Sequence, residues 1–263
     1  MQKITALILI VVSLAWFVAE GAPVERVRLS VPADAAAEVK NVARVLAARL
    51  DERAGVESVT TGRAPLTVRF LVDADLGWDS YRISGEGAEI VIAAGDAAGL
   101  LHGAGRLLRE SRFDQGGFSA GTWRGTAVPG KRFRAMYWAT HFGNTYHWGD
   151  LDDMVRYVED MGLMGYNRLM TWFDPEPYSS PEDPGVEEYM SRMCRYLKAA
   201  QDVGMKVGVI DASNMSYGDY APERLRATSR NGKLSHREIC PSKPGGQELI
   251  LELHRDIYER IVA

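Results

Sequence analysis

The stretch RFRAMYWATHFGNTYHWGDLDDMVRYVEDMGLMGYNRLMTW, residues 132–172, decides the fold. It opens with an apolar run over 133–138 that is typical of a buried strand. After Asp150, a suitable helix N-cap, apolar residues recur at the spacing of one helix face until Gly165, a residue favoured just past a helix end. A second apolar run over 167–172 predicts the next strand. The stretch therefore reads as strand, helix, strand.

The same pattern continues to residue 263. A helix that ends at Gly204 is followed by a strand over 206–210 and by a last helix. Three βα units in a row predict parallel strands with right-handed crossovers. The long loops follow strands rather than helices, and no Gly-rich turn follows the first strand, which favours a (β/α)₈ barrel over a doubly wound dinucleotide fold. We expect residues 132–263 to form the first three βα units of an incomplete TIM (β/α)₈ barrel.

The preceding segment predicts a separate, smaller domain. Short β-type runs occur at 26–31, 66–72, 81–84 and 89–93, and two amphipathic helical patterns lie after the first and the last of them. This order predicts a small N-terminal α/β sandwich over residues 22–122. Residues 116–130 are Gly-rich, and a linker is expected over residues 123–131. Gly99, Gly103 and Gly105 lie inside the second helical pattern, where close packing of helix on sheet explains them.

The first residues predict export. Lys3 precedes an apolar run over 4–19, and Ala19 and Gly21 supply the small residues of a cleavage site. We interpret residues 1–21 as a cleavable secretory signal peptide, with no stable membrane insertion after its removal. The mature protein is then expected to be secreted or periplasmic.

The composition excludes several function classes. Lys plus Arg is 31 and Asp plus Glu is 35, a formal net charge of −4, so no basic surface for nucleic acid is expected. The two cysteines, Cys194 and Cys240, can either pair or remain free thiols, and they exclude a Cys-based zinc site. His141 and His147 lack a third close ligand. No metal and no cofactor are expected.

The loops after the predicted strands hold the candidate site, because functional residues of such barrels lie at the strands' carboxyl ends. Aromatic rings beside polar groups suit a sugar, although core or loop packing is the alternative for each. The candidate carbohydrate-binding residues are Trp138, His141, Asn144, Asn167, Trp172 and Asn214. Asp211 and Asp174 are weak catalytic candidates. Asp211 is expected inside the barrel mouth or as a structural cap, and Asp174 as a sugar ligand or as the start of the turn at Pro175.

Four motifs carry a family resemblance: GDAAGLLHG at 95–103, RAMYWATHF at 134–142, MGYN at 164–167 and ICPS at 239–242. Their order resembles the N-terminal α/β domain and barrel start of glycoside hydrolases such as bacterial β-N-acetylhexosaminidases and α-glucuronidases, over about residues 25–263. Together with the predicted signal peptide, the resemblance implies the N-terminal portion of an exported, retaining glycoside hydrolase that acts on glycans.

The chain also departs from that family. Thr140 stands where those hexosaminidases carry a sugar-binding arginine, and residues 209–214 lack their Pro-Glu segment, so N-acetylhexosamine specificity is not implied. Their acidic pair follows a fourth strand, and this sequence holds three units. We expect the chain to be truncated and inactive alone. A non-catalytic carbohydrate-binding protein or a decayed enzyme fragment is the alternative.

Overall fold

Two compact units make up the part of the chain that the structure describes. The computed structural model describes residues 22–114, 117–140 and 143–262. The first unit holds the described residues up to Gly130 together with Leu163–Gly165, and the second holds the others from Lys131 onward. The predicted signal peptide and the candidate His141 lie outside the described residues. Among the helices that are described, none is both long and apolar enough to cross a membrane.

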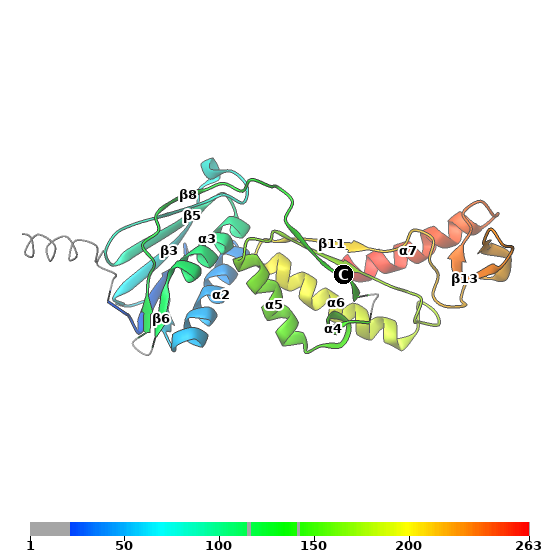
Figure 1. The fold of residues 1–263 in the computed structure, drawn as a ribbon, viewed down its shortest axis with the longest axis horizontal. Helices are drawn as coiled ribbons and strands as arrows, with labels where there is room; N and C mark the ends of the chain where they lie inside the picture. Colours follow the sequence, from blue (N-terminus) through cyan, green and yellow to red (C-terminus); the bar gives the residue numbers. More distant parts are fainter. Residues whose placement is uncertain (1–21, 115–116, 141–142, 263) are drawn as a thin grey trace, which may run out of the picture. The chain divides into compact units, whose positions relative to one another are not determined.

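The first unit is a six-stranded mixed sheet with both of its α-helices on one face (Figure 1). Its elements are β1 Arg26–Ser30, α2 Ala37–Ala54, β2 Glu57–Val59, β3 Leu66–Val72, η1 Ala74–Leu76, β4 Tyr81–Ser84, β5 Glu89–Ala94, α3 Ala97–Glu110 and β8 Gly125–Ala127, with a hairpin of β6 Arg112–Asp114 and β7 Gly117–Ser119. The strand order is β2-β1-β3-β5-β4-β8, and β4 alone runs antiparallel to both of its neighbours. The predicted α/β sandwich is confirmed.

Glycines let α3 approach the sheet closely. Asp96 caps this helix by accepting a 2.8 Å hydrogen bond from the Gly99 N–H. A Cβ atom at Gly99 would lie 2.7 Å from the Ser80 carbonyl oxygen, and one at Gly103 would lie 2.5 Å from the Ile92 Cγ2. Side chains at these positions would push the helix away from the sheet, which supports the packing interpretation of this Gly-rich motif.

The segment expected to be a linker contains a strand of the sheet. Within residues 123–131, β8 pairs antiparallel with β4, joining Tyr81 to Ala127 and Ile83 to Gly125. The expectation of a linker from residue 123 is therefore corrected, because the sheet continues to Ala127 and the first unit to Gly130. Three-residue strands carry too short an alternation to be found by hydrophobic period.

We expect residues 22–130, expressed alone, to give a cooperative thermal transition by circular dichroism, since they hold a sheet, two helices and their shared core. A version that stops at residue 122 should melt lower, because β4 loses the ladder to β8. Each kcal/mol lost from the free energy of unfolding lowers the Tm of a domain this size by roughly 4–8 °C. Equal melting temperatures, or a featureless melt of the longer version, would contradict this.

The second unit is a run of parallel βα units. Its strands are β9 Ala135–Trp138, β10 Arg168–Trp172 and β11 Lys206–Ile210, and its helices are α4 Thr145–Trp148, α5 Leu151–Leu163, α6 Pro184–Asp202 and α7 Gly246–Val262. The sheet order is β11-β10-β9, and both pairings are parallel. The loop after β11 adds η3 Glu223–Leu225 and the antiparallel pair β12 Arg226–Thr228 and β13 Leu234–Ile239. The three predicted βα units are confirmed.

Alternation along these strands gives the sheet two different sides. Thr171 is 0 % exposed, and its Oγ1 lies 3.0 Å from the Tyr196 hydroxyl of α6, so it faces the helices. Trp138 of β9 and Val209 of β11 pair with Thr171 in register and lie on this same helix-facing side. The intervening side chains, including Trp172, lie on the other side, which we call the open side.

Trp138 anchors the core between strands and helices. It is 0 % exposed and stacks on Tyr146, with ring centroids 4.8 Å apart and planes 6° apart. Tyr157 of α5 and Tyr196 of α6 complete the aromatic cluster. Trp138 was expected to contact a sugar, and that expectation is corrected: full burial against helices makes it a core residue.

Replacing Trp138 with alanine should destabilise the chain by about 3–5 kcal/mol, the usual loss when a buried large aromatic is truncated. Trp148 is the matched control, since it is 68 % exposed, and Trp148→Ala should stay within about 0.5 kcal/mol of the parent. Urea denaturation measures both. Similar losses in the two variants would contradict the core assignment.

Candidate functional site

The carboxyl ends of the three parallel strands are tied together at one edge of the sheet. The Thr140 hydroxyl, after β9, donates to the backbone carbonyl of Trp172 at the end of β10. The Phe173 N–H then donates to the Ile210 carbonyl at the end of β11, at 2.9 Å. Loops over 139–150, 173–183 and 211–245 therefore start from neighbouring points, as expected for the functional edge of a parallel βα fold.

The first of these loops contains an ordered turn and an exposed aromatic. Asn144 caps α4: its Oδ1 accepts from the Tyr146 N–H at 3.2 Å, and its Nδ2 donates to the Ala139 carbonyl at 2.7 Å. These bonds show a structural role for Asn144, whose sugar-binding role stays a prediction. Trp148 is largely exposed, and the His147 ring stacks on Tyr189 with centroids 4.5 Å apart.

The second loop brings Trp172 and Asp174 to the same edge. Trp172 lies on the open side of the sheet and is partly exposed, a position compatible with a sugar ring. Asp174 Oδ1 accepts a 3.1 Å hydrogen bond from the Glu176 N–H, which closes a turn around Pro175. The expected turn at Asp174 is thus observed. Its second carboxylate oxygen is not used in this turn, so a role for Asp174 as a sugar ligand stays a prediction.

Asp211 occupies a different place from the one expected. It follows β11 in the same alternation as Val209, on the helix-facing side, and its Oδ2 lies 3.5 Å from Nδ1 of His254 in α7. This separation is an ion-pair distance, longer than a good hydrogen bond. Burial raises the pKa of Asp211, and the charge of His254 partly offsets that effect. The expected position inside the barrel mouth is corrected, and its catalytic role stays a prediction.

Two candidate asparagines make hydrogen bonds to backbone groups. Asn167 is 1 % exposed and lies before β10, at the end of the sheet opposite to the loops described above. Its Oδ1 accepts from the Arg134 N–H at 3.0 Å, and its Nδ2 donates to the Arg132 carbonyl at 2.9 Å. The expectation that Asn167 contacts a sugar is therefore corrected, and its role is structural. Asn214 Nδ2 donates to the Ile239 carbonyl at 3.2 Å, and its sugar-binding role stays a prediction.

An ionic cluster that sequence reasoning missed joins the second and third loops. The Glu176 carboxylate lies 3.1 Å from Nε2 of His236 and accepts a hydrogen bond from the Arg237 guanidinium. Hydrogen bonding from His236 and Arg237 holds the pKa of Glu176 below its usual value, although partial burial opposes them. The position of Glu176 after a strand is a sequence signal for a functional residue. Its partners lie 60 and 61 positions away, and no sequence pattern marks them.

The depressed pKa of Glu176 predicts a pH-dependent contribution to stability. A carboxyl whose folded pKa lies below its unfolded value, near 4.3, stabilises the fold above that pH and loses this effect as the pH falls through the folded pKa. Glu176→Gln should cost about 0.5–1 kcal/mol at pH 7. The difference from the parent should shrink as the pH drops below about 5.

Glu238→Gln is the matched control for this prediction, since Glu238 is exposed and lies one residue past Arg237. It should leave the urea midpoint unchanged across the same pH range. A Glu176→Gln loss that persists undiminished at pH 3, or an equal loss in the control, would show that the cluster does not act through the charge of Glu176.

The site carries no obvious metal position in the part of the chain that is described. Within it, no group of three or more His, Cys, Asp or Glu side chains is close enough together to hold a metal ion. Cys194 and Cys240 are both free thiols, so the unpaired alternative is the one observed.

The fold of this chain is similar to that of several solved bacterial enzymes. An exo-β-N-acetylglucosaminidase from Vibrio harveyi, solved with N-acetylglucosamine, matches with a TM-score of 0.66 at 13 % identity, covering 91 % of this chain and 42 % of its own. A chitobiase from Flavobacterium johnsoniae matches with a TM-score of 0.64 at 16 % identity, covering 91 % of this chain and 41 % of its own. A β-hexosaminidase from Streptomyces plicatus matches with a TM-score of 0.58 at 19 % identity, covering 91 % of this chain and 52 % of its own.

The sequence itself matches one family in its first unit. Residues 20–122 match the model described as glycosyl hydrolase family 20, domain 2. The predicted resemblance to bacterial β-N-acetylhexosaminidases is confirmed, whereas the resemblance to α-glucuronidases stays a prediction. No curated protein sequence gives a significant match. The chain spans about 41–52 % of the length of the solved structures named above.

Proposed function

We propose that this chain is the N-terminal portion of an exported, retaining glycoside hydrolase that acts on glycans. The family 20 domain match over residues 20–122 is the observation that carries the proposal. It is followed by parallel βα units in an order shared with solved β-hexosaminidases over 91 % of this chain. Export rests on the signal-peptide pattern of residues 1–21.

Glycan binding is supported by the side chains at the carboxyl edge of β9–β11. Trp172 on the open side and the exposed Trp148 offer aromatic faces that suit the apolar faces of a sugar ring. Thr140 lies at the same edge, and its hydroxyl is bonded to the Trp172 carbonyl. We therefore propose a glycan substrate without committing it to N-acetylhexosamine.

Hydrolysis by this chain alone is not supported by its acids. Glycoside hydrolysis generally needs a carboxylic acid that protonates the leaving-group oxygen, and the common mechanism adds a second carboxyl group across the scissile bond. Of the two candidates, Asp211 packs beside His254 on the helix-facing side, and Asp174 closes a turn. We propose that the chain by itself binds glycans without cleaving them.

Affinity electrophoresis against a panel of soluble polysaccharides, together with assays on aryl glycosides, tests this proposal. We expect retardation by at least one polysaccharide, loss of that retardation in Trp172→Ala, and no release of aryl alcohol. Phe133→Ala is the control, because Phe133 is 64 % exposed but precedes β9 at the opposite end of the strands. Absence of binding to every glycan would contradict the proposal. Turnover would contradict the inactivity of the chain and make Asp174 and Asp211 the first residues to replace.

A further inference from the structure

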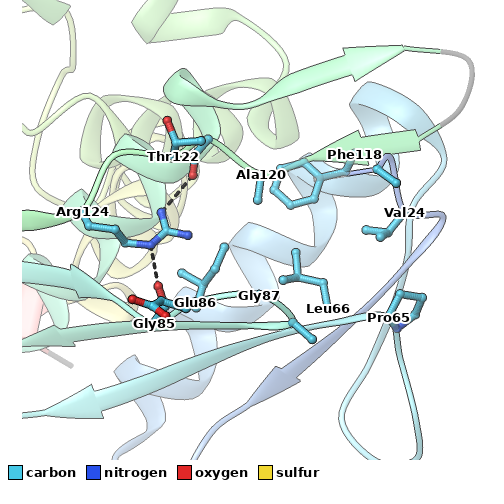
Figure 2. A pocket seen from close by; sticks show the side chains of 14 residues that line it. Val24, Pro65, Leu66, Gly85, Glu86, Gly87, Phe118, Ala120, Thr122 and Arg124 are labelled. Carbon is cyan, nitrogen blue, oxygen red and sulfur yellow. Dashed lines mark hydrogen bonds between the residues drawn. The ribbon is translucent and has the colours of Figure 1, made fainter. Parts of the chain in front are cut away.

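The first unit holds a cavity of about 560 Å³ within its own fold (Figure 2). One rim is the turn between β4 and β5, residues 85–88, and the other is the segment 120–124. Leu66, Ile90 and Phe118 form an apolar floor, and each of them is at most 6 % exposed. A volume of this size is typical of small-molecule sites, which occupy roughly 300–1,000 Å³.

A single guanidinium spans the two rims. Arg124 Nε donates to the Gly85 carbonyl at 3.0 Å, and its Nη1 donates to the carbonyls of Gly121 and Trp123 at 2.9 and 2.8 Å (Figure 2). Among the described residues these three carbonyls are its hydrogen-bond partners, and no carboxylate pairs with it. Its Nη2 therefore keeps two N–H donors at the mouth of the cavity, which Glu86 also lines.

Each rim contains a glycine packed so closely against other backbone atoms that no larger residue can replace it. A Cβ atom at Gly85, where φ is +98°, would lie 2.4 Å from the Glu89 carbonyl oxygen. A Cβ atom at Gly121 would lie 2.5 Å from the Glu110 carbonyl oxygen. Two of the three carbonyls that orient Arg124 thus belong to tightly packed backbone, which holds the guanidinium in place before any ligand arrives.

We propose that this cavity binds a small aromatic carboxylate. The ring would lie on the apolar floor, and the carboxylate would accept hydrogen bonds from Nη2 of Arg124. Hydrogen bonds from the charged guanidinium to a carboxylate are charge-assisted, and such bonds are about twice as strong as neutral ones. The site is independent of the glycan-binding edge proposed for the second unit, so either proposal can fail without the other.

Isothermal titration of the full chain with 2-naphthoate, and with neutral 2-naphthamide of the same shape, tests the inference without any variant. We expect saturable binding of the acid and at least about tenfold weaker binding of the amide, equivalent to about 1.4 kcal/mol. No saturable binding of 2-naphthoate, or equal affinities for acid and amide, would overturn the proposal.

Two variants locate the site. Arg124→Gln should weaken 2-naphthoate binding about tenfold or more while leaving 2-naphthamide unchanged, and Ala120→Phe should abolish binding by filling the cavity that Ala120 lines. Arg230→Gln is the control, because it removes one exposed charge from the second unit. Thermal melts establish that each variant is folded. Acid binding that survives both Arg124→Gln and Ala120→Phe in folded protein would place the ligand elsewhere and overturn the inference.

Discussion

The parallel hydrogen-bonded ladder of β9, β10 and β11 is the constraint on which the candidate site depends. Its register places Trp138, Thr171 and Val209 in one row, and strand alternation then assigns every neighbouring side chain to one of two sides. The helix-facing side becomes core, as the full burial of Trp138 and Thr171 shows. The open side keeps side chains such as Trp172 available for a ligand.

This division explains why position in the sequence was an incomplete guide to function. Asp211 follows a strand, as a catalytic residue of a βα fold should, yet alternation turns it toward His254 in α7. Asn167 lies next to the same ladder but at its opposite end, where it bonds to backbone groups of residues 132 and 134. A catalytic role needs the correct end of the strand and the correct side as well.

Much of the fold was predictable because its longer elements carry a full hydrophobic period. The helices α2, α3, α5 and α6 and the strands β3, β10 and β11 all lie where their apolar residues indicate. The three-residue strands β2 and β8 were missed, since they are too short to show alternation. The Glu176 cluster was missed for a different reason: its contacts depend on where the strands β12 and β13 place His236 and Arg237, which local sequence does not encode.

The two sides of the β9–β11 sheet can be measured directly by thiol reactivity. In a background of Cys194→Ala and Cys240→Ala, a cysteine is introduced at Met170 or at Thr171, neighbours on β10 that alternation assigns to opposite sides. The account predicts rapid maleimide modification of Met170→Cys, on the open side, and strong protection of Thr171→Cys in the native chain. The reverse order, or equal rates at both positions, would contradict the assignment of the sides and with it the placement of Trp138, Trp172 and Asp211.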